Sequence, residues 1–208
     1  MALLRPQVNL IKLSLNVSHY PKAVENISNL TLDPKWRWFV ESECTASYIF
    51  RHQSGFVYQL FKKGHINLTG VRKVEDIERA ISIIYNIIGI PKIIASDYRI
   101  DNIQASGALN LNSRHKSLKT ICDNLNSVKD ECNIKKLSFE SQRFPGAFIR
   151  YADERCRGTV ILFNSRRFVL VGVKSLEDIN TIHNWLEISI WKAVSRQEAS
   201  LPPADMTM

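Results

Sequence analysis

Two stretches of the chain match each other without a gap: QLFKKGHINLTGVRKVEDIERAISIIYNII (Gln59–Ile88) and ILFNSRRFVLVGVKSLEDINTIHNWLEISI (Ile161–Ile190). Phe61 pairs with Phe163, and every other matched pair has the same spacing, 163 − 61 = 102. A repeat of this kind indicates an architecture of two similar units, and the local features belong to one unit or the other. A tandem duplication of a unit near half the chain is the simplest explanation. The alternative is two unrelated strand–helix units with coincidental similarity.

Composition and charge narrow the class of protein. The 208 residues are 45% hydrophobic and 23% charged, which is ordinary for a globular protein and excludes wholesale disorder. Lys and Arg exceed Asp and Glu by 28 to 20, so the net charge of +8 favours an acidic partner. The four cysteines have no metal-ligand spacing, so no metal or cofactor is expected. Arg5, Pro6 and Lys12 interrupt the apolar start, and no stretch is apolar enough to span a bilayer, so we expect an intracellular protein without a membrane contact.

Each copy predicts the same order of elements. The alternation and helical spacing of apolar residues predict, in the first copy, strand 10–17, helix 21–30, strands 47–51, 56–61 and 66–69, and helix 74–88. The second copy predicts strand 98–102, helix 118–125, strands 144–151, 159–163 and 168–171, and helix 176–190. Several strands followed by one long helix predict an antiparallel sheet with helices on one face. The opposite face is then free for a long anionic ligand.

Several motifs stand in the order found in one known family. RFPGAFIR (143–150) resembles its Phe-Pro-Gly-x-x-x-Arg strand, and LFKKGHINLTGVR (60–72) and the stretch 162–174 resemble its two Phe-Ser-Ser-Gly-Lys…Thr-Gly-Ala-Lys segments. YRIDNI (98–103) resembles the Phe-Lys-Ile-Gln-Asn-Met strand that opens its second repeat, and Gly-Ile-Pro (89–91) resembles the Gly-Phe-Pro that ends its first long helix. The family is that of the TATA-box-binding proteins, and the resemblance covers roughly residues 6–191.

The resemblance implies an α+β fold: a saddle of two pseudo-symmetric repeats that form one curved ten-stranded antiparallel sheet, with helices on the convex face. The expected domains are a first repeat over 6–91 and a second over 92–192. The tail 193–208, which holds Pro-Pro and small residues, is expected to be disordered.

The resemblance also implies phenylalanine wedges that kink DNA from the minor groove. Phe144, before Pro145 in the Phe-Pro-Gly motif, and Phe163 match the second wedge pair, and Phe61 matches one member of the first. The fourth wedge is open. An alignment anchored on Arg51 and Arg150 gives Thr45, whereas one anchored on Asp-Pro-Lys (33–35) gives Trp38 or Phe39. In both alignments the segment 36–43 is interpreted as an insertion.

Other family contacts carry over residue by residue. Asn102 matches the asparagine that hydrogen-bonds the central base pairs, with Asn9 as a looser first-repeat mate, and Thr69 matches a base-contacting threonine whose second-repeat counterpart is Val171. The residues expected at phosphates are Arg51, Arg72, Arg150, Arg167 and Lys174. Phe148 and Phe168 are interpreted as core residues under the helices, and His183 as a surface residue.

The implied function is that of a general transcription initiation factor in the nucleus, which binds double-stranded promoter DNA and nucleates the preinitiation complex. Its partners would be factors like transcription factors IIB and IIA and TBP-associated factors, with Glu140 and Gln142 at the site for the first of these. The alternative is a TBP-like scaffold without TATA specificity, which acts through protein partners or at other promoters. An enzyme such as a DNA glycosylase is not expected, because its catalytic helix-hairpin-helix domain has no room in the chain.

Overall fold

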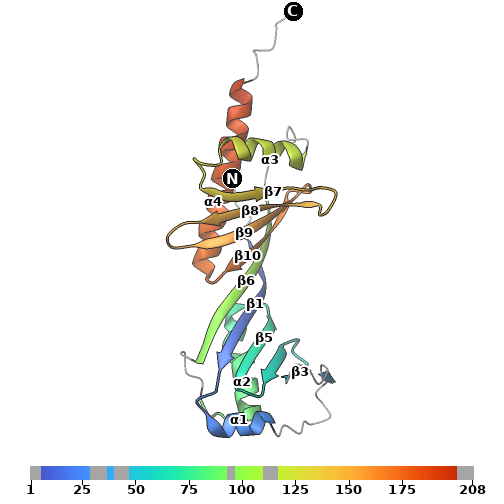
Figure 1. Cartoon of the computed structure of the whole chain (residues 1–208), viewed down its shortest axis with the longest axis vertical. Helices are drawn as coiled ribbons and strands as arrows, with labels where there is room; N and C mark the ends of the chain where they lie inside the picture. Colours follow the sequence, from blue (N-terminus) through green and yellow to red (C-terminus); the bar gives the residue numbers. More distant parts are fainter. Residues whose placement is uncertain (1–5, 29–36, 40–46, 93–96, 110–116, 201–208) are drawn as a thin grey trace, which may run out of the picture. The chain divides into compact units, whose positions relative to one another are not determined.

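The chain folds around one sheet whose strand order is symmetrical. The computed structural model describes residues 6–28, 37–39, 47–92, 97–109 and 117–200. The strands are β1 (Gln7–Asn16), β2 (Arg37–Phe39), β3 (Ser47–Arg51), β4 (Val57–Phe61), β5 (His65–Val71), β6 (Tyr98–Ala108), β7 (Ile134–Ser138), β8 (Gly146–Ala152), β9 (Arg157–Phe163) and β10 (Arg167–Val173). Their order is β2-β3-β4-β5-β1-β6-β10-β9-β8-β7 (Figure 1). The second half of this order mirrors the first, as a tandem duplication predicts.

Contacts divide the chain into two compact units. The N-terminal unit is Val8–Gln104, and the C-terminal unit holds the described residues from Ala105 on, with Pro6 and Gln7. The division therefore falls inside β6, whose first residues bond within the N-terminal unit: Asp101 accepts hydrogen bonds from Ser14 of β1 and from Arg99. The repeat boundary expected between residues 91 and 92 stays a prediction.

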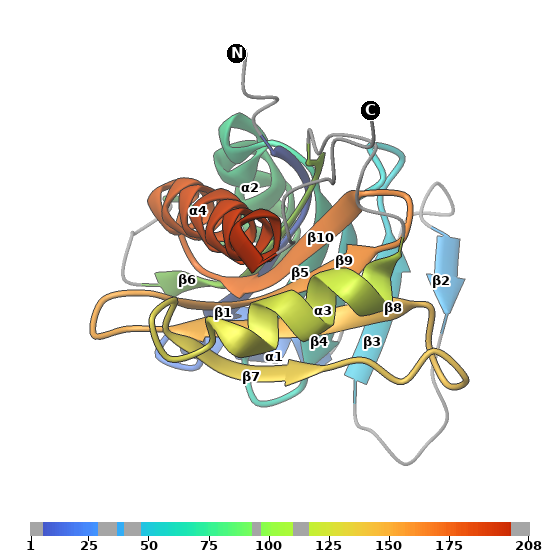
Figure 2. The ribbon, with the colours of Figure 1, turned by 90° about the horizontal axis from the view of Figure 1, so that it is seen from above.

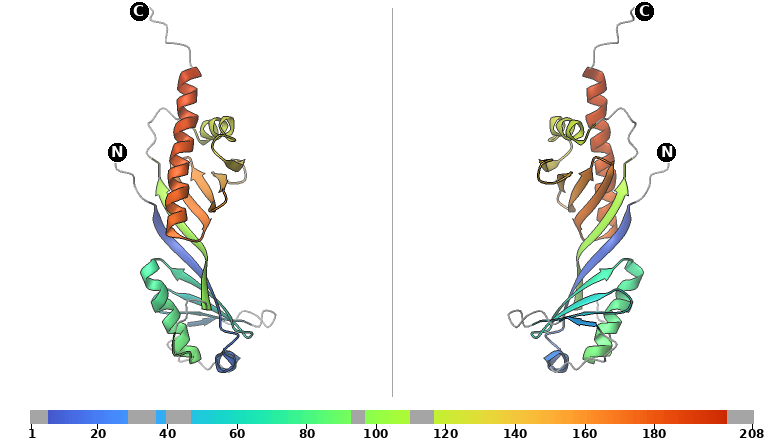
Figure 3. Two further views of the ribbon diagram at one scale, coloured as in Figure 1. Left: turned by 90° about the vertical axis from the view of Figure 1, so that its left-hand side faces the viewer. Right: turned by 90° about the vertical axis from the view of Figure 1, so that its right-hand side faces the viewer.

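In the N-terminal unit, helices α1 (Pro21–Ser28) and α2 (Ile77–Ile88) lie on one face of the strands (Figure 3). The short 3₁₀ turn η1 (Val74–Asp76) precedes α2, so the helix predicted over 74–88 begins as a 3₁₀ turn. One side of α2 is buried on the sheet, and the Tyr58 hydroxyl of β4 donates to the Ala80 carbonyl at 2.7 Å. The helix ends at Gly89, whose N–H donates to the Tyr85 carbonyl.

In the C-terminal unit, α3 (Leu118–Ser127) packs against α4 (Leu176–Ser200), and α4 lies along β9 and β10 (Figure 2). The hydroxyl of Ser175 accepts from the Asp178 N–H at 3.0 Å and so caps the start of α4. The expectation of a disordered tail from 193 is wrong for residues 193–200, which continue α4. Residues 201–208 lie outside the described part of the chain. No helix in the described residues is long and apolar enough to cross a membrane.

His183 of α4 is buried and not at the surface as expected. Only 4% of the residue is exposed, and its ring stacks on Phe168 with the centroids 5.6 Å apart. Phe168 of β10 is itself 1% exposed, so its expected place in the core is confirmed.

Candidate nucleic-acid interface

The strands of each unit have one face covered by helices and one face without them, which we call the covered face and the open face. Along β8 the buried residues Ala147, Ile149 and Tyr151 alternate with exposed Phe148 and Arg150. The same alternation runs through the neighbouring strands, because successive side chains of a strand point to opposite faces. It assigns each candidate residue within a strand to one face.

The open face of the C-terminal unit carries three clustered aromatic rings. The Phe144 ring centroid is 5.1 Å from that of Phe148 and 6.0 Å from that of Phe163. Phe144 and Phe148 are 37% and 38% exposed, which is unusual for large apolar side chains. Phe144 and Phe163, which lie far apart in the sequence, are therefore brought together as a pair.

Gly146 permits this cluster by its lack of a side chain. It lies opposite Phe163 in the β8–β9 ladder. A Cβ at this position would lie 2.7 Å from the Phe144 ring and 2.9 Å from Ile161. The Phe-Pro-Gly motif thus has a physical role here, because any larger residue after the exposed Pro145 would displace the rings.

Phe148 was predicted for the core under the helices, and this prediction is wrong. Its neighbours in the ladder are Ile161 and Ser138, and it shares the face of Arg150, two residues along β8. A single-residue step along a strand decides the face, so a phenylalanine two positions after Gly146 must lie on the same side as the cluster. Strict alternation from the Phe-Pro-Gly motif would have found Phe148.

Basic side chains flank the aromatic cluster on the same face. Arg150 lies directly opposite Lys136 of β7 and Thr159 of β9, and both basic residues are exposed. Arg157 of β9 is also exposed and was not selected from the sequence. The other expected phosphate contacts, namely Arg51, Arg72, Arg167 and Lys174, are all exposed too. Lys136 was missed because β7, the edge strand that contains it, was not predicted from the sequence.

The N-terminal unit reproduces the register of the C-terminal unit. Ser47 lies opposite Phe61, as Gly146 lies opposite Phe163. Strand β2 pairs with β3 as β7 pairs with β8: the pairs Arg37–Arg51, Trp38–Phe50 and Phe39–Ile49 correspond to Lys136–Arg150, Leu137–Ile149 and Ser138–Phe148. The spacing is constant, since 136 − 37 = 99 and 150 − 51 = 99.

This register overturns the predicted insertion over 36–43. Between the paired strands, residues 40–46 correspond to 139–145 with no length difference. The alignment anchored on Arg51 is therefore the consistent one, and it matches Thr45 with Phe144. Trp38 and Phe39 correspond to Leu137 and Ser138. Thr45 itself lies outside the described residues, whereas Phe61 and Thr69 are half-buried in β4 and β5.

The two asparagines expected in the groove do not correspond to each other. Asn102, half-buried in β6, directly precedes the buried Ile103. In β1 the residue that directly precedes the buried Ile11 is Leu10, and Asn9 is one position earlier and exposed. Because one step moves a side chain to the other face, Asn9 does not occupy the first-half position of Asn102. Val171, in contrast, is half-buried opposite Thr159, as Thr69 is opposite Val57.

The expected partner site forms an exposed turn before β8. Glu140 makes an ion pair with Arg143, with 3.2 Å between Oε2 and Nη1, and the Phe144 N–H donates to the Glu140 carbonyl. Gln142 is exposed on the same turn. Both charged side chains are well exposed, so the pair contributes little stability and Glu140 stays available to a partner.

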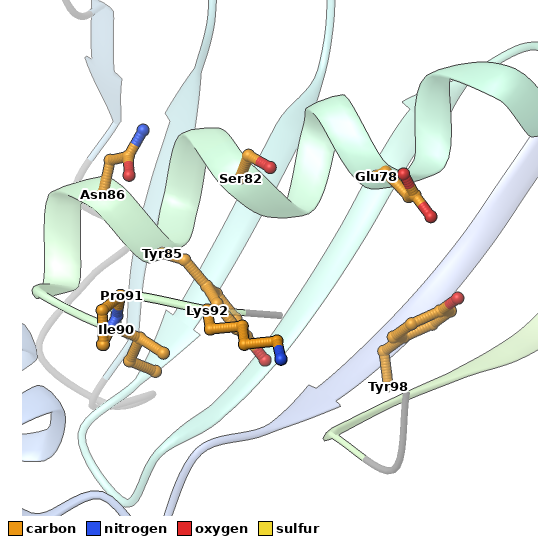
Figure 4. Close-up of a pocket in the computed structure, with 8 residues that line it drawn as sticks. All are labelled: Glu78, Ser82, Tyr85, Asn86, Ile90, Pro91, Lys92 and Tyr98. Carbon is orange, nitrogen blue, oxygen red and sulfur yellow. The ribbon is translucent and has the colours of Figure 1, made fainter. Parts of the chain in front are cut away.

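A separate pocket of about 450 Å³ lies beside α2 in the N-terminal unit (Figure 4). Glu78, Ser82 and Asn86 line it from successive turns of the helix, and Tyr85 and Tyr98 reach into it. Next to it, the buried Asp97 accepts from the Tyr85 and Tyr20 hydroxyls at 3.2 and 3.1 Å and pairs with His19 at 3.2 Å. None of the predicted site residues lines this pocket.

The chain is similar to archaeal proteins of one kind. It is 30% identical to the TATA-box-binding protein of Archaeoglobus fulgidus over 122 residues, 57% of this chain and 60% of that protein. It is 26% identical to TATA-box-binding protein 2 of Haloferax volcanii over 59% of this chain and 61% of that protein. It is 28% identical to TATA-box-binding protein 1 of Methanosarcina acetivorans over 67% of this chain and 76% of that protein. The chain thus spans about three fifths of the length of the first two relatives.

A solved structure agrees. The Methanococcus jannaschii TBP superposes with a TM-score of 0.66 over 90% of this chain and 99% of that chain, at 20% sequence identity. The chain is similar to the TATA-box-binding proteins in sequence and in fold. No protein-family model matches it. The TATA-box-binding-protein fold expected from the sequence, an antiparallel sheet with helices on one face of each repeat, is confirmed.

Proposed function

We propose that the chain is a transcription initiation factor that binds double-stranded promoter DNA in the minor groove through the open faces of its two units. The observation that carries this proposal is the exposed cluster of Phe144, Phe148 and Phe163 on the same face as Arg150. An exposed apolar cluster beside basic residues suits a ligand that is both charged and stacked. The similarity to TATA-box-binding proteins supports the same reading.

The cluster would act as a wedge. The minor groove offers a degenerate set of base edges, so binding there depends on apolar contact, a few polar groups and the ease of deforming the DNA. Rings inserted between base steps unstack them, and the bent duplex then contacts more protein surface. In this proposal Phe144 and Phe163 enter the step, and Gly146 lets the rings lie close to the strand.

The protein partners and the location in the cell are likewise proposals. Glu140 and Gln142 would bind a factor like transcription factor IIB, and other surfaces would bind factors like IIA and TBP-associated factors. The chain would work by binding alone and not as an enzyme. A nuclear location applies only if the source has a nucleus, because the relatives above are archaeal and archaea lack one.

A second candidate function is that of a TBP-like scaffold without TATA specificity. The match of Thr45 with Phe144 favours it, because threonine cannot replace a ring between base steps. Such a chain would bind DNA with little sequence preference and would act mainly through protein partners.

A titration of duplexes tests the first candidate against the second. Asn102→Ala should reduce the preference for an A·T-rich site over a scrambled one, because it removes a hydrogen-bonding group from the groove floor. Arg150→Ala should weaken binding to both duplexes and lower the salt slope of log K by about one unit. Lys119→Ala removes one charge at an exposed position of α3 and serves as the matched control. It should leave the salt slope of log K unchanged for both duplexes. An unchanged site preference in Asn102→Ala would favour the scaffold.

A further inference from the structure

The open faces of the two units differ at corresponding positions. In the C-terminal unit Val169 lies opposite Ile161, and Ile161 lies opposite Phe148. The corresponding positions in the N-terminal unit, 102 residues earlier for the first two, are Asn67 and Gln59, which also lie opposite each other. An aliphatic pair on one open face is thus replaced by an amide pair on the other.

The amide pair belongs to a row of polar side chains that crosses five strands, which we call the amide row: Asp101, Ser14, Asn67, Gln59 and Ser47. Ser14 lies opposite Asn67 in the β1–β5 ladder. Ser14, Asn67 and Gln59 are on the open face, because they alternate with fully buried leucines, an isoleucine and a tyrosine in their own strands.

The hydrogen bonds between the amides of the row all donate toward Ser47. The Asn67 Nδ2 donates to Gln59 Oε1 at 3.2 Å, and Gln59 Nε2 donates to the Ser47 hydroxyl at 3.4 Å. At the other end, the Ser14 hydroxyl donates to Asp101, which Arg99 also contacts at 2.8 Å. The oxygen of Asn67 accepts no hydrogen bond from the residues that the structure describes. It is therefore an acceptor on the open face with its capacity unused.

The base edges of the minor groove give this oxygen one matching group. A·T pairs present only acceptors there, whereas a G·C pair adds the guanine 2-amino donor. An amide oxygen brought against an A·T pair would lose its water without gaining a partner, which is unfavourable. An aliphatic side chain such as Val169 carries no such penalty and does not distinguish the pairs in this way.

We propose that Asn67, held by Gln59, makes the N-terminal unit read a G·C pair in the minor groove by accepting from the guanine 2-amino group. This inference rests on the proposed minor-groove binding and adds a specificity to it. The chain would then bind a composite site: a step opened by phenylalanines next to the C-terminal unit, and a guanine-containing segment next to the N-terminal unit.

Inosine substitution tests the proposal directly, because inosine lacks the 2-amino group and keeps the major-groove edge of guanine. A set of duplexes carries one G·C pair at successive positions of an A·T-rich site, each with an inosine twin, and the full chain is titrated with each. We expect one position where replacing guanine by inosine weakens binding roughly three- to tenfold, the value of one hydrogen bond. Equal affinity for guanine and inosine at every position would overturn the proposal, and so would a gain with inosine.

Variants then assign the effect to Asn67. Asn67→Val, which installs the residue of the corresponding position 169, should bind the guanine and inosine duplexes equally. Asn184→Val, an amide replaced at an exposed position of α4, should keep the full difference. A difference that persists in Asn67→Val would show that another group reads the guanine. The inosine comparison with the unaltered chain does not depend on how well a variant folds.

The outcomes also separate this inference from the proposed function. Site-preferring, salt-dependent binding with no inosine effect would retain minor-groove binding and reject the guanine contact. Absence of binding to every duplex would reject both.

Discussion

The two phenylalanines Phe148 and Phe168 have the same chemistry and opposite roles, because of the face on which each lies. Phe168 is buried at 1% exposure and packs on His183 and Gly107, where an added Cβ would lie 2.6 Å from its ring. Phe148 is 38% exposed beside Phe144. A buried ring contributes to folding, whereas an exposed one is available to a ligand.

Truncation of these two rings should therefore separate stability from binding. Phe168→Ala should lower the free energy of unfolding by about 3–5 kcal/mol, as large core truncations do. Phe148→Ala should lower it by less than about 1 kcal/mol and still weaken binding to duplex DNA. Denaturant titrations and fluorescence binding assays measure the two effects. A large loss of stability in Phe148→Ala would show that the ring belongs to the core.

Asp101 should make the stability of the fold depend on acid pH. Burial raises the pKa of Asp101, but hydrogen bonds from Ser14 and Arg99 and the charge of Lys12 outweigh it, so its pKa lies below the ordinary value. A carboxyl of this kind stabilises the folded chain above its unfolded pKa, about 4. That stabilisation is lost as the pH falls through the lower folded value.

Asp101→Asn removes this titration, so its unfolding free energy should fall less steeply than that of the unaltered chain below about pH 4. Urea midpoints measured from about pH 6 down to about pH 3 give the comparison. Parallel curves for the two proteins would mean that the carboxyl is not stabilised by its neighbours.

Among the elements, β5 and β10, the strands that precede α2 and α4, each contain a glycine in a left-handed conformation. Gly70 has φ +83° and Gly172 has φ +84°. In the β1–β5 ladder the register shifts here, since Ile11 lies opposite Val71 but Leu13 lies opposite Leu68. An extra residue of this kind is a β-bulge, and glycine tolerates the backbone that it requires.

The two bulges offer a matched pair of substitutions. An alanine Cβ at Gly172 would find its nearest neighbour 3.9 Å away, whereas at Gly70 it would lie 2.4 Å from the Gly55 carbonyl oxygen. Gly172→Ala should cost only the left-handed conformation, about 1–2 kcal/mol. Gly70→Ala should cost clearly more, because backbone and not a flexible side chain blocks the Cβ. Denaturant midpoints compare them, and equal losses would contradict the close approach at Gly70.

The elements predicted from the sequence were those with strong periodicity. The long helix over 74–88, the hairpin at 47–61 and the strands around Phe163 follow directly from apolar spacing and turn residues. Strands β2 and β7 were missed, because β2 has three residues and β7 is a five-residue edge strand with Lys135 and Lys136. The extension of α4 to Ser200 was missed since small and polar residues there give little apolar pattern.

The candidate site was predictable where repeat and motif agree. Phe144 and Phe163 were found from the Phe-Pro-Gly motif and the 102-residue repeat, and the structure brings their rings together. Asn9 differs by one residue from Asn102 in the burial pattern of its strand, and this offset is invisible in the sequence alone. The pairing of Gln59 with Asn67 depends on strand register, which the sequence alone does not fix.

At the scale of the whole molecule, duplication supplies two similar units and later divergence gives them different open faces. One unit keeps three clustered rings, and the other keeps Phe61 with the amide row. A symmetrical scaffold on a DNA duplex has two equivalent orientations, so unequal faces are what allow it to choose one. Transcription needs a direction, and this difference would supply it.

Unequal faces also predict an unequal bend. Phe144→Ala or Phe163→Ala should reduce DNA bending more than Phe61→Ala, because each removes part of a ring pair. In the N-terminal half, the residue 99 positions before Phe144 is a threonine, Thr45, and not a phenylalanine. Energy transfer between dyes at the two ends of a duplex measures the bend in each complex at saturating protein. Binding affinity measured in parallel separates a loss of bending from a loss of occupancy. Equal reductions from all three variants would mean that the two units kink DNA alike, and that another ring of the N-terminal unit serves beside Phe61.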